Sequence, residues 1–251
     1  QNMTAYSTYN IGDEIWGAPA IDDLDGDGDY EIAITCKNNF FYIFDHLGNL
    51  IYNYDTEEYL MAAPAIDSNK HVWVPTFGSD GTIFVFHNTD EDWTHYSWST
   101  GKKIQKGIAL HDMNFDGEID FVYGTDSNTI EVQISGQELD IYNVGSKVRN
   151  APAIVEFRDN EFLIVAGSKD DNLYAINPIT GQQQFVYQTN GDVESPSFFE
   201  HRQNGTVITF GSADGNLYMI DTNGNDVPGW PKDLGAPVKG SPSISDVNGD
   251  G

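Results

Sequence analysis

Apolar and polar residues alternate along most of the chain in short runs that end at glycine, asparagine or aspartate. Alternation with a period of two is typical of β-strands that bury one face, and residues 172–176 and 216–220 show it most strictly. A helix would need apolar residues at positions i, i+3, i+4 and i+7, and no stretch of helical length has them. The pattern therefore predicts an all-β protein of short strands joined by tight turns.

This pattern repeats about every 44 residues, and a short motif of small residues, most often ending in proline, marks each repeat. The third position of the motif falls at residues 19, 64, 108, 152, 196 and 242. Each repeat contains four runs of strand length. Four antiparallel strands in about 40–50 residues predict one blade of a β-propeller. A β-solenoid is the alternative, but its coils repeat at roughly half this length.

The repeats predict five complete blades plus parts of a sixth. The expected blades cover approximately residues 17–61, 62–105, 106–149, 150–193 and 194–239. Residues 3–10 stand where a fourth strand would precede the first blade, and residues 240–251 begin another first strand. Both are expected to be parts of a closing or further blade, because pairing the two ends of a propeller removes exposed sheet edges. We therefore expect residues 1–251 to be a single β-propeller segment of a longer chain.

Charge and composition narrow the range of partners. The 251 residues include 12 Lys and Arg against 39 Asp and Glu, which gives a formal net charge of −27. No cluster of basic residues offsets it, so we expect no nucleic acid partner and no attraction to anionic lipid. No apolar run reaches the roughly 18 residues of a membrane span, so we expect no membrane insertion. The single cysteine, Cys36, excludes an internal disulfide.

The first turn of three repeats carries acidic residues at a fixed spacing. The first such loop reads D-x-D-x-D-G-x-x-E and the second D-x-N-x-D-G-x-x-D, while the third begins the same pattern and reaches the last residue of the sequence. The candidate metal ligands are Asp23, Asp25, Asp27, Asp29 and Glu31; Asp112, Asn114, Asp116, Glu118 and Asp120; and Asp246, Asn248 and Asp250.

Oxygen ligands at alternate positions converge when such a loop curls around a hard cation, and the glycine at its sixth position permits the sharp turn. Five or six oxygens favour Ca²⁺ over zinc, because no His/Cys cluster is present. The alternative is an acidic turn that binds nothing, since Asp, Asn and Gly are common turn residues. Recurrence at the same turn of three repeats, and the repulsion among unneutralised carboxylates, favour Ca²⁺ as the cofactor.

Residues 17–32, which combine the small-residue motif with the first acidic loop, resemble the FG-GAP/VCBS repeats of integrin α-chain propellers and many bacterial secreted proteins. Residues 167–176 and 211–218 resemble quinoprotein-like blades. Residues 228–231, followed by 240–242, are similar to repeats in large surface proteins of Bacteroidetes-type bacteria. The resemblance implies a secreted, extracellular or cell-surface propeller stabilised by Ca²⁺. Millimolar extracellular Ca²⁺ would saturate sites that cytosolic levels leave empty.

No set of residues with catalytic spacing is present. The six histidines are scattered, and nucleophile-elbow, P-loop and zinc-protease motifs are absent. The aromatic segment 93–98 is expected on the fourth strand of the second blade, with Trp93, His95 and Ser97 on one face. That face is expected to pack between blades, and stacking on sugar rings is the alternative.

Two classes of function remain. The first is a non-enzymatic binding or adhesion module of a larger secreted or cell-surface protein, with a protein or glycan ligand. The second is a Ca²⁺-dependent polysaccharide lyase or hydrolase propeller domain. A lyase has to neutralise an acidic sugar, and the few, thinly spread basic residues favour the binding module over the enzyme. A redox role with a quinone cofactor ranks third, because no cofactor-binding set is found.

Overall fold

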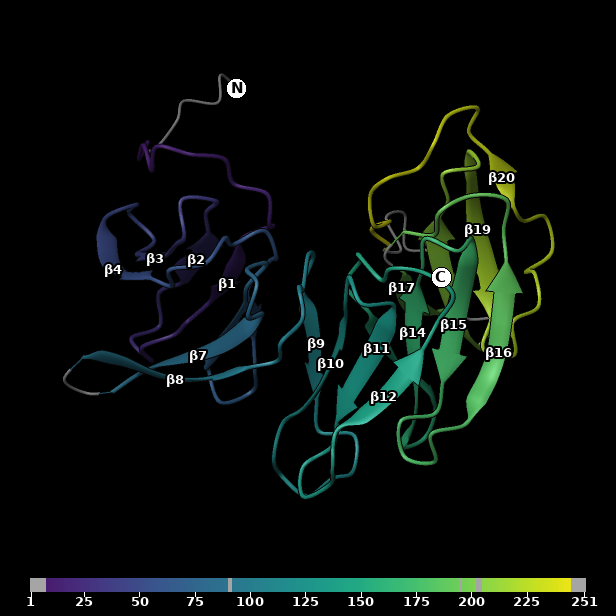
Figure 1. The fold of residues 1–251 in the computed structure, drawn as a ribbon, viewed down its shortest axis with the longest axis horizontal. Helices are drawn as coiled ribbons and strands as arrows, with labels where there is room; N and C mark the ends of the chain where they lie inside the picture. Colours follow the sequence, from purple (N-terminus) through teal and green to yellow (C-terminus); the bar gives the residue numbers. More distant parts are fainter. Residues whose placement is uncertain (1–7, 90–91, 195, 202–204, 245–251) are drawn as a thin grey trace. The chain divides into compact units, whose positions relative to one another are not determined.

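A computed structural model of the chain describes residues 8–89, 92–194, 196–201 and 205–244. The chain divides into two compact units, residues 1–108 and 109–251. All regular structure in the described residues is β-strand, with no helix (Figure 1). The prediction of an all-β fold is confirmed.

The first unit contains two four-stranded antiparallel sheets in which the strands follow one another in chain order. The first sheet consists of β1 (Ala20–Asp22), β2 (Glu31–Thr35), β3 (Phe40–Phe44) and β4 (Leu50–Asp55). The second consists of β5 (Ala65–Ile66), β6 (Val72–Pro75), β7 (Thr82–Asn88) and β8 (Trp93–Ser99). Each sheet is therefore a meander in which each strand pairs with the next one along the chain.

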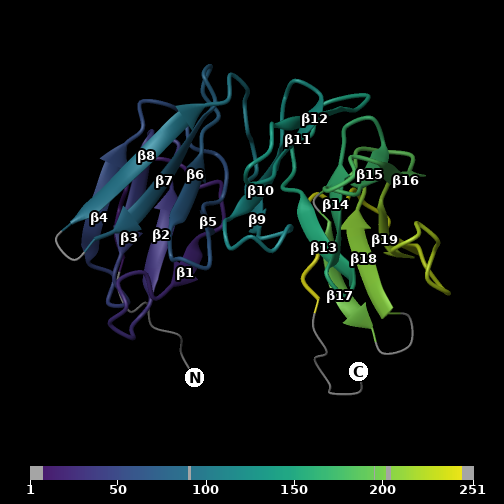
Figure 2. The ribbon, with the colours of Figure 1, turned by 90° about the horizontal axis from the view of Figure 1, so that it is seen from below.

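The second unit contains three further sheets of the same kind, the first of which begins at the unit boundary (Figure 2). The third sheet of the chain consists of β9 (Ile108–His111), β10 (Asp120–Gly124), β11 (Thr129–Gln133) and β12 (Asp140–Asn143). The fourth consists of β13 (Ala153–Arg158), β14 (Glu161–Gly167), β15 (Asn172–Ile176) and β16 (Gln183–Gln188). The fifth consists of β17 (Ser197–His201), β18 (Gly205–Gly211), β19 (Asn216–Asp221) and β20 (Lys232–Asp233).

These five sheets are the five four-stranded antiparallel blades that the repeats predict. The expected parts of a further blade fall largely on residues 1–7 and 245–251, outside the described residues. Residues 8–10 and 240–244, which are described, contain no strand.

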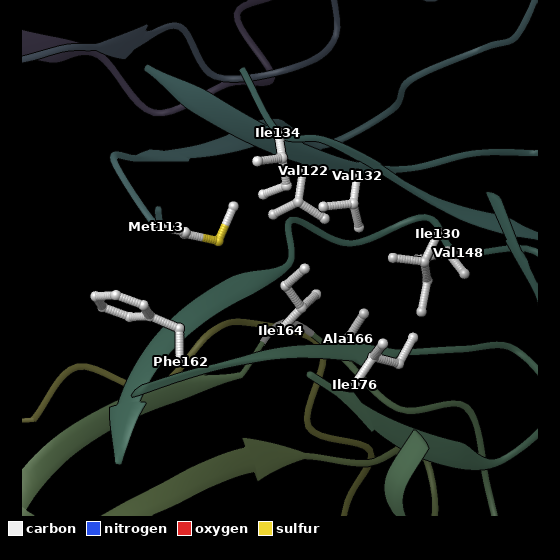
Figure 3. Packing of buried hydrophobic residues seen from close by; sticks show 10 residues of the cluster. All are labelled: Met113, Val122, Ile130, Val132, Ile134, Val148, Phe162, Ile164, Ala166 and Ile176. Carbon is white, nitrogen blue, oxygen red and sulfur yellow. The ribbon is translucent and has the colours of Figure 1, made fainter. Parts of the chain in front are cut away.

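Side-chain burial follows the position of a strand within its sheet. All five residues of β10 are buried, whereas β4 alternates between half-buried and exposed residues. A middle strand has a covered sheet face on both sides, so its apolar residues form near-continuous runs. In the second unit, Val122 and Val132 face Ile164 and Ala166 of the next sheet across an apolar core (Figure 3). Within each unit, packing between the faces of successive sheets therefore holds the blades together.

The glycine that precedes the turn between the second and third strands is required by close packing. A Cβ atom at Gly124 or Gly167 would lie 2.1 Å or 2.6 Å from the following linker, which contains Val148 or Val193. In the second sheet the equivalent turn is longer, because Thr76 N–H bonds to Thr82, whereas Thr125 N–H bonds to Thr129. Gly78 lies inside this longer turn.

The linkers between sheets are hydrogen-bonded to the turns of the sheets that they lead into. Tyr59 O accepts a hydrogen bond from Phe77 N–H at 2.7 Å in the first unit. Asp192 O accepts one from Ala213 N–H at 2.8 Å in the second. These hydrogen bonds fasten the linkers to the sheets that follow them and satisfy part of their backbone polar groups.

Candidate metal centre

The first acidic loop brings three of its predicted ligands together. Carboxylate oxygens of Asp23, Asp25 and Asp27 lie within 4.8 Å of one another. Asp25 and Asp27 are exposed, and Asp23 is half-buried. Three hard, anionic oxygen donors converging on one point suit Ca²⁺ or another hard divalent cation. The donor set of this trio therefore fits the metal that the spacing predicts.

The local backbone explains why the trio converges. Asp23 accepts hydrogen bonds from the N–H groups of Gly26 at 2.8 Å and Gly28 at 3.2 Å, so its carboxylate lies inside the curl of the loop. Both glycines have positive φ angles, 80° and 96°, which side chains with a Cβ rarely adopt. Asp25 and Asp27 each accept a hydrogen bond from the residue two positions on, Asp27 and Asp29.

The other two predicted ligands of this loop lie outside the trio. Asp29 places a carboxylate oxygen 3.5 Å from Nδ1 of His46. Glu31, which is 2% exposed, accepts a hydrogen bond from Leu24 N–H at 2.8 Å. Burial raises the pKa of Glu31, and the carboxylates of the trio raise it further. The negative charge of the trio thus acts on the Glu31 carboxylate beneath the loop. A cation bound by the trio would relieve that repulsion.

A lysine from the second sheet approaches the beginning of the loop. Lys70 Nζ lies 2.7 Å from a carboxylate oxygen of Asp22, and this hydrogen bond lowers the pKa of Asp22. The same Asp22 oxygen accepts a hydrogen bond from Asp23 N–H at 2.9 Å, so the ion pair neutralises a carboxylate next to the trio without pairing with the carboxylates of the trio themselves. The negative charge of Asp23, Asp25 and Asp27 is therefore left for a cation from solution.

The second acidic loop has the same backbone course but a different set of side-chain contacts. Asp112 accepts hydrogen bonds from Asp116 N–H at 3.1 Å and Gly117 N–H at 2.9 Å. Asn114 donates from Nδ2 to Asp116 at 2.9 Å, so one candidate ligand oxygen is already engaged. Hydrogen bonds from Glu118 N–H and Asn114 lower the pKa of Asp116. Glu118 itself is exposed.

Asp120 ends this loop in the place that Glu31 holds in the first. It is fully buried and accepts hydrogen bonds from Met113 N–H and Ser135 N–H, each at 2.7 Å. Burial raises its pKa, and the carboxylates of Asp116 and Asp112 add to the effect. The third predicted set, Asp246, Asn248 and Asp250, lies outside the described residues.

A groove runs between the first loop and the β7–β8 hairpin. Its volume is about 540 Å³, within the range of about 300–1,000 Å³ typical of small-molecule sites. Its lining consists of Leu24, Asp25, Asp27, Asn88, Thr89, Asp92 and Trp93. Of the hairpin residues, only Trp93 stood out in the sequence. The pattern predicts the hairpin itself, but its position beside the loop depends on packing between two sheets.

Comparison with known proteins supports the fold alone. No family model and no curated protein matches the chain. Sqt1 from Saccharomyces cerevisiae superposes with a TM-score of 0.68 at 16% identity, over 88% of this chain and 63% of that one. BamB from Moraxella catarrhalis superposes with a TM-score of 0.63 at 16% identity, over 95% of this chain and 80% of that one. The Dos1 propeller superposes with a TM-score of 0.60 at 12% identity, over 80% of this chain and 55% of that one.

The chain is thus a β-propeller of four-stranded antiparallel blades, and it spans less than two thirds of the length of two of these three structures. Among the residues that the structure describes, no helix is long and apolar enough to cross a membrane.

Proposed function

We propose that this chain is a Ca²⁺-stabilised, non-enzymatic binding module of a larger secreted or cell-surface protein, related to FG-GAP/VCBS repeat propellers. The observation that carries the proposal is the convergence of Asp23, Asp25 and Asp27 in an exposed loop. Ca²⁺ takes six to eight oxygen ligands, and the trio supplies side-chain oxygens on one side of such an ion. The second loop, around Asp112 and Asp116, would bind Ca²⁺ after the Asn114 amide turns its oxygen inward.

The buried carboxylates support a structural role for the ion. Glu31 and Asp120 lie beneath the two loops; burial raises the pKa of each, and the loop carboxylates raise it further. Without a cation, each loop concentrates negative charge around a buried acid. A bound Ca²⁺ would convert that repulsion into attraction and so stabilise the first two strands of each sheet.

The distribution of basic residues supports binding rather than polysaccharide cleavage. A lyase needs cationic side chains that are free to neutralise a uronate, whereas here many face carboxylates. The described ion pairs include Lys37–Glu14, Lys70–Asp22, Arg149–Asp126, Arg158–Glu161 and Lys169–Asp192. Such pairs do not supply the anion site of a lyase.

Calorimetric titration and thermal melting of the metal-free protein test the metal. We expect heat of binding with Ca²⁺ and a melting temperature that rises by several degrees, since ligand at about 100 times Kd contributes about 2.7 kcal/mol. Asp25→Asn should weaken binding, whereas Asp13→Asn, an exposed residue outside the loop, should not. Absence of both heat and melting shift would contradict the proposal, and an equal response to Mg²⁺ would contradict the choice of ion.

The compartment is testable separately. Protease treatment of intact source cells should remove the chain if it is displayed at the surface or secreted. Complete protection in intact cells, with degradation after lysis, would exclude the extracellular location while leaving the calcium measurement unaffected.

A further inference from the structure

The groove beside the first acidic loop combines an aromatic wall with unused polar groups. We refer to its residues, Leu24, Asp25, Asp27, Asn88, Thr89, Asp92 and Trp93, as the loop–hairpin groove. Trp93 stacks on Tyr52 with ring centroids 5.7 Å apart, which fixes the plane of the indole ring. A ring that is held by its own packing can receive a ligand with little loss of conformational entropy.

The polar groups of the groove are positioned by the hairpin turn. Thr89 Oγ1 donates to Asp92 O at 2.7 Å, and Asp92 caps Trp93 N–H at 2.8 Å with one carboxylate oxygen. Among the described residues, neither the Asn88 side-chain amide nor the Trp93 indole N–H has a hydrogen-bond partner. Donors and acceptors therefore remain available next to the indole ring, an arrangement that suits a ligand with both apolar and hydroxyl-bearing faces.

Asp25 and Asp27 belong both to the metal trio and to the groove. A cation held by the trio would therefore border the groove, and three side chains leave part of its oxygen shell to water or to a ligand. Vicinal hydroxyl groups can fill that part. The Asp92 carboxylate and the net charge of −27 repel uronates and sulfated sugars, so the fitting ligand is neutral.

We propose that the loop–hairpin groove binds a neutral saccharide, with a pyranose ring against Trp93 and a pair of vicinal hydroxyl groups directed to the cation side of the groove at Asp25 and Asp27. The proposal deepens the binding function stated above and rests on it for the cation. It names the ligand class as neutral pyranosides rather than proteins or acidic polysaccharides.

The experiment uses the whole chain, labelled with ¹⁵N, and follows its five tryptophan indole N–H signals. The probes are methyl glycosides of glucose, mannose, galactose, fucose and N-acetylglucosamine, with methyl glucuronoside as the anionic control. We expect at least one neutral glycoside to shift the Trp93 signal in Ca²⁺ and the shift to disappear in chelator. Trp93→Ala should weaken binding roughly tenfold or more, which corresponds to about 1.4 kcal/mol.

Two variants separate loss of the groove from loss of the fold. Asn88→Ala leaves the Trp93–Tyr52 stack in place and should weaken binding of the same glycoside severalfold. Trp16→Ala removes an indole that is 53% exposed and does not line the groove, and it should leave binding unchanged. Equal loss in all three variants would overturn the assignment of the groove.

The outcomes distinguish the two proposals. If calorimetry shows Ca²⁺ binding but no glycoside shifts Trp93, the saccharide proposal is overturned and the calcium proposal stands. If a glycoside binds equally well in chelator, the groove stands and the bridging role of the cation is overturned. A basic peptide that shifts Trp93 and is displaced by Ca²⁺ would instead assign the groove to cationic side chains.

Discussion

The carboxylate of Glu31 accepts a hydrogen bond from the backbone N–H of Leu24 at 2.8 Å. The bond spans the first acidic loop and ties its second residue to the beginning of β2. The carboxylate of Asp120 accepts a hydrogen bond from Met113 N–H at 2.7 Å in the same way across the second loop. In each loop the last acidic residue thus supports the loop from below, while the earlier residues present their carboxylates above it.

We expect Glu31→Gln to stabilise the metal-free protein at neutral pH. A raised pKa means that ionisation of Glu31 costs the folded state, so stability falls as pH rises from the ordinary value of about 4.5 through the raised value. The amide keeps an acceptor for Leu24 N–H and removes the charge, so the free energy of unfolding should rise. Urea unfolding in chelator measures the change in stability. In Ca²⁺ the wild type should be the more stable of the two proteins. A variant less stable than wild type in chelator would contradict this expectation.

Asp120→Asn should have the opposite effect. The two carboxylate oxygens of Asp120 accept from two different N–H groups, of Met113 and Ser135, and an amide has only one acceptor oxygen. One buried N–H would face an NH₂ group, which costs about 1–3 kcal/mol. Chemical denaturation with and without Ca²⁺ measures the loss. Asp159→Asn, at an exposed position, is the control, and equal stability of the two variants would count against the two-acceptor role.

Glu58→Gln should weaken the second sheet at neutral pH. Burial alone would raise the pKa of Glu58, but hydrogen bonds from Thr76 and from the N–H groups of Asp80 and Thr82 outweigh it and hold the pKa below its ordinary value. The stability that this carboxylate contributes is present above about pH 4.5 and is lost as pH falls through the lowered pKa.

The expected loss for this variant is about 1–3 kcal/mol at pH 7 and much less in acid, measured by unfolding across pH. Glu57→Gln, at the exposed neighbouring residue, should leave both stability and its pH profile unchanged. A loss of the same size at every pH would show that the charge of Glu58 is not what holds the turn.

His95 should make the first unit sensitive to mild acid. Its ring lies 4.4 Å from that of Tyr54 and 5.2 Å from that of Phe86, and burial there lowers its pKa, with a smaller contribution from His87. Stability is retained above about pH 6.5 and is lost as pH falls through the lowered pKa, because the unfolded chain binds the proton first. His95→Phe should reduce the change in melting temperature between pH 7 and pH 5, whereas His46→Gln should leave that change as it is in the wild type.

Gly26→Ala should destabilise the first loop by about 1 kcal/mol. The residue has φ of 80°, and no atom lies within 4 Å of the position of an added Cβ, so the loss reports backbone strain alone. Gly240→Ala, at a site with open space and no positive φ, is the matched control. Thermal melting of the two variants should differ by several degrees, and equal melting temperatures would disprove the strain.

The strands were predictable because each repeat states the same alternation several times. The run 172–176 coincides with β15, and the run 216–220 covers β19 except for its last residue. Packing of Trp93 between sheets was also predictable, since outer strands have to cover their neighbours. The spacing of Asp23, Asp25 and Asp27 indicated their convergence, because a loop that curls at glycines places alternate side chains on its inner side.

What the sequence did not reveal depends on contacts between repeats or on single atoms. The spacing made Glu31 and Asp120 equivalent to the other acidic residues of their loops, but both are buried, whereas the earlier acidic residues are exposed or half-buried. The Asn114–Asp116 hydrogen bond distinguishes the second loop, and a shared motif cannot show it. The loop–hairpin groove joins residues more than sixty positions apart, such as Asp27 and Asp92, and only packing between the sheets brings them together.

The paired linkers bear on how the chain responds to proteases. Cleavage requires a segment that can be drawn into an extended, unpaired conformation. The linker after β4 is held at Thr56, which bonds to Asn39, and at Tyr59, which bonds to Phe77. The hairpin tip at Leu47, by contrast, is 47% exposed. Limited digestion should therefore cut tips before linkers. The fragments should stay associated until denaturant separates them, because each cut falls between strands that remain hydrogen-bonded to their neighbours.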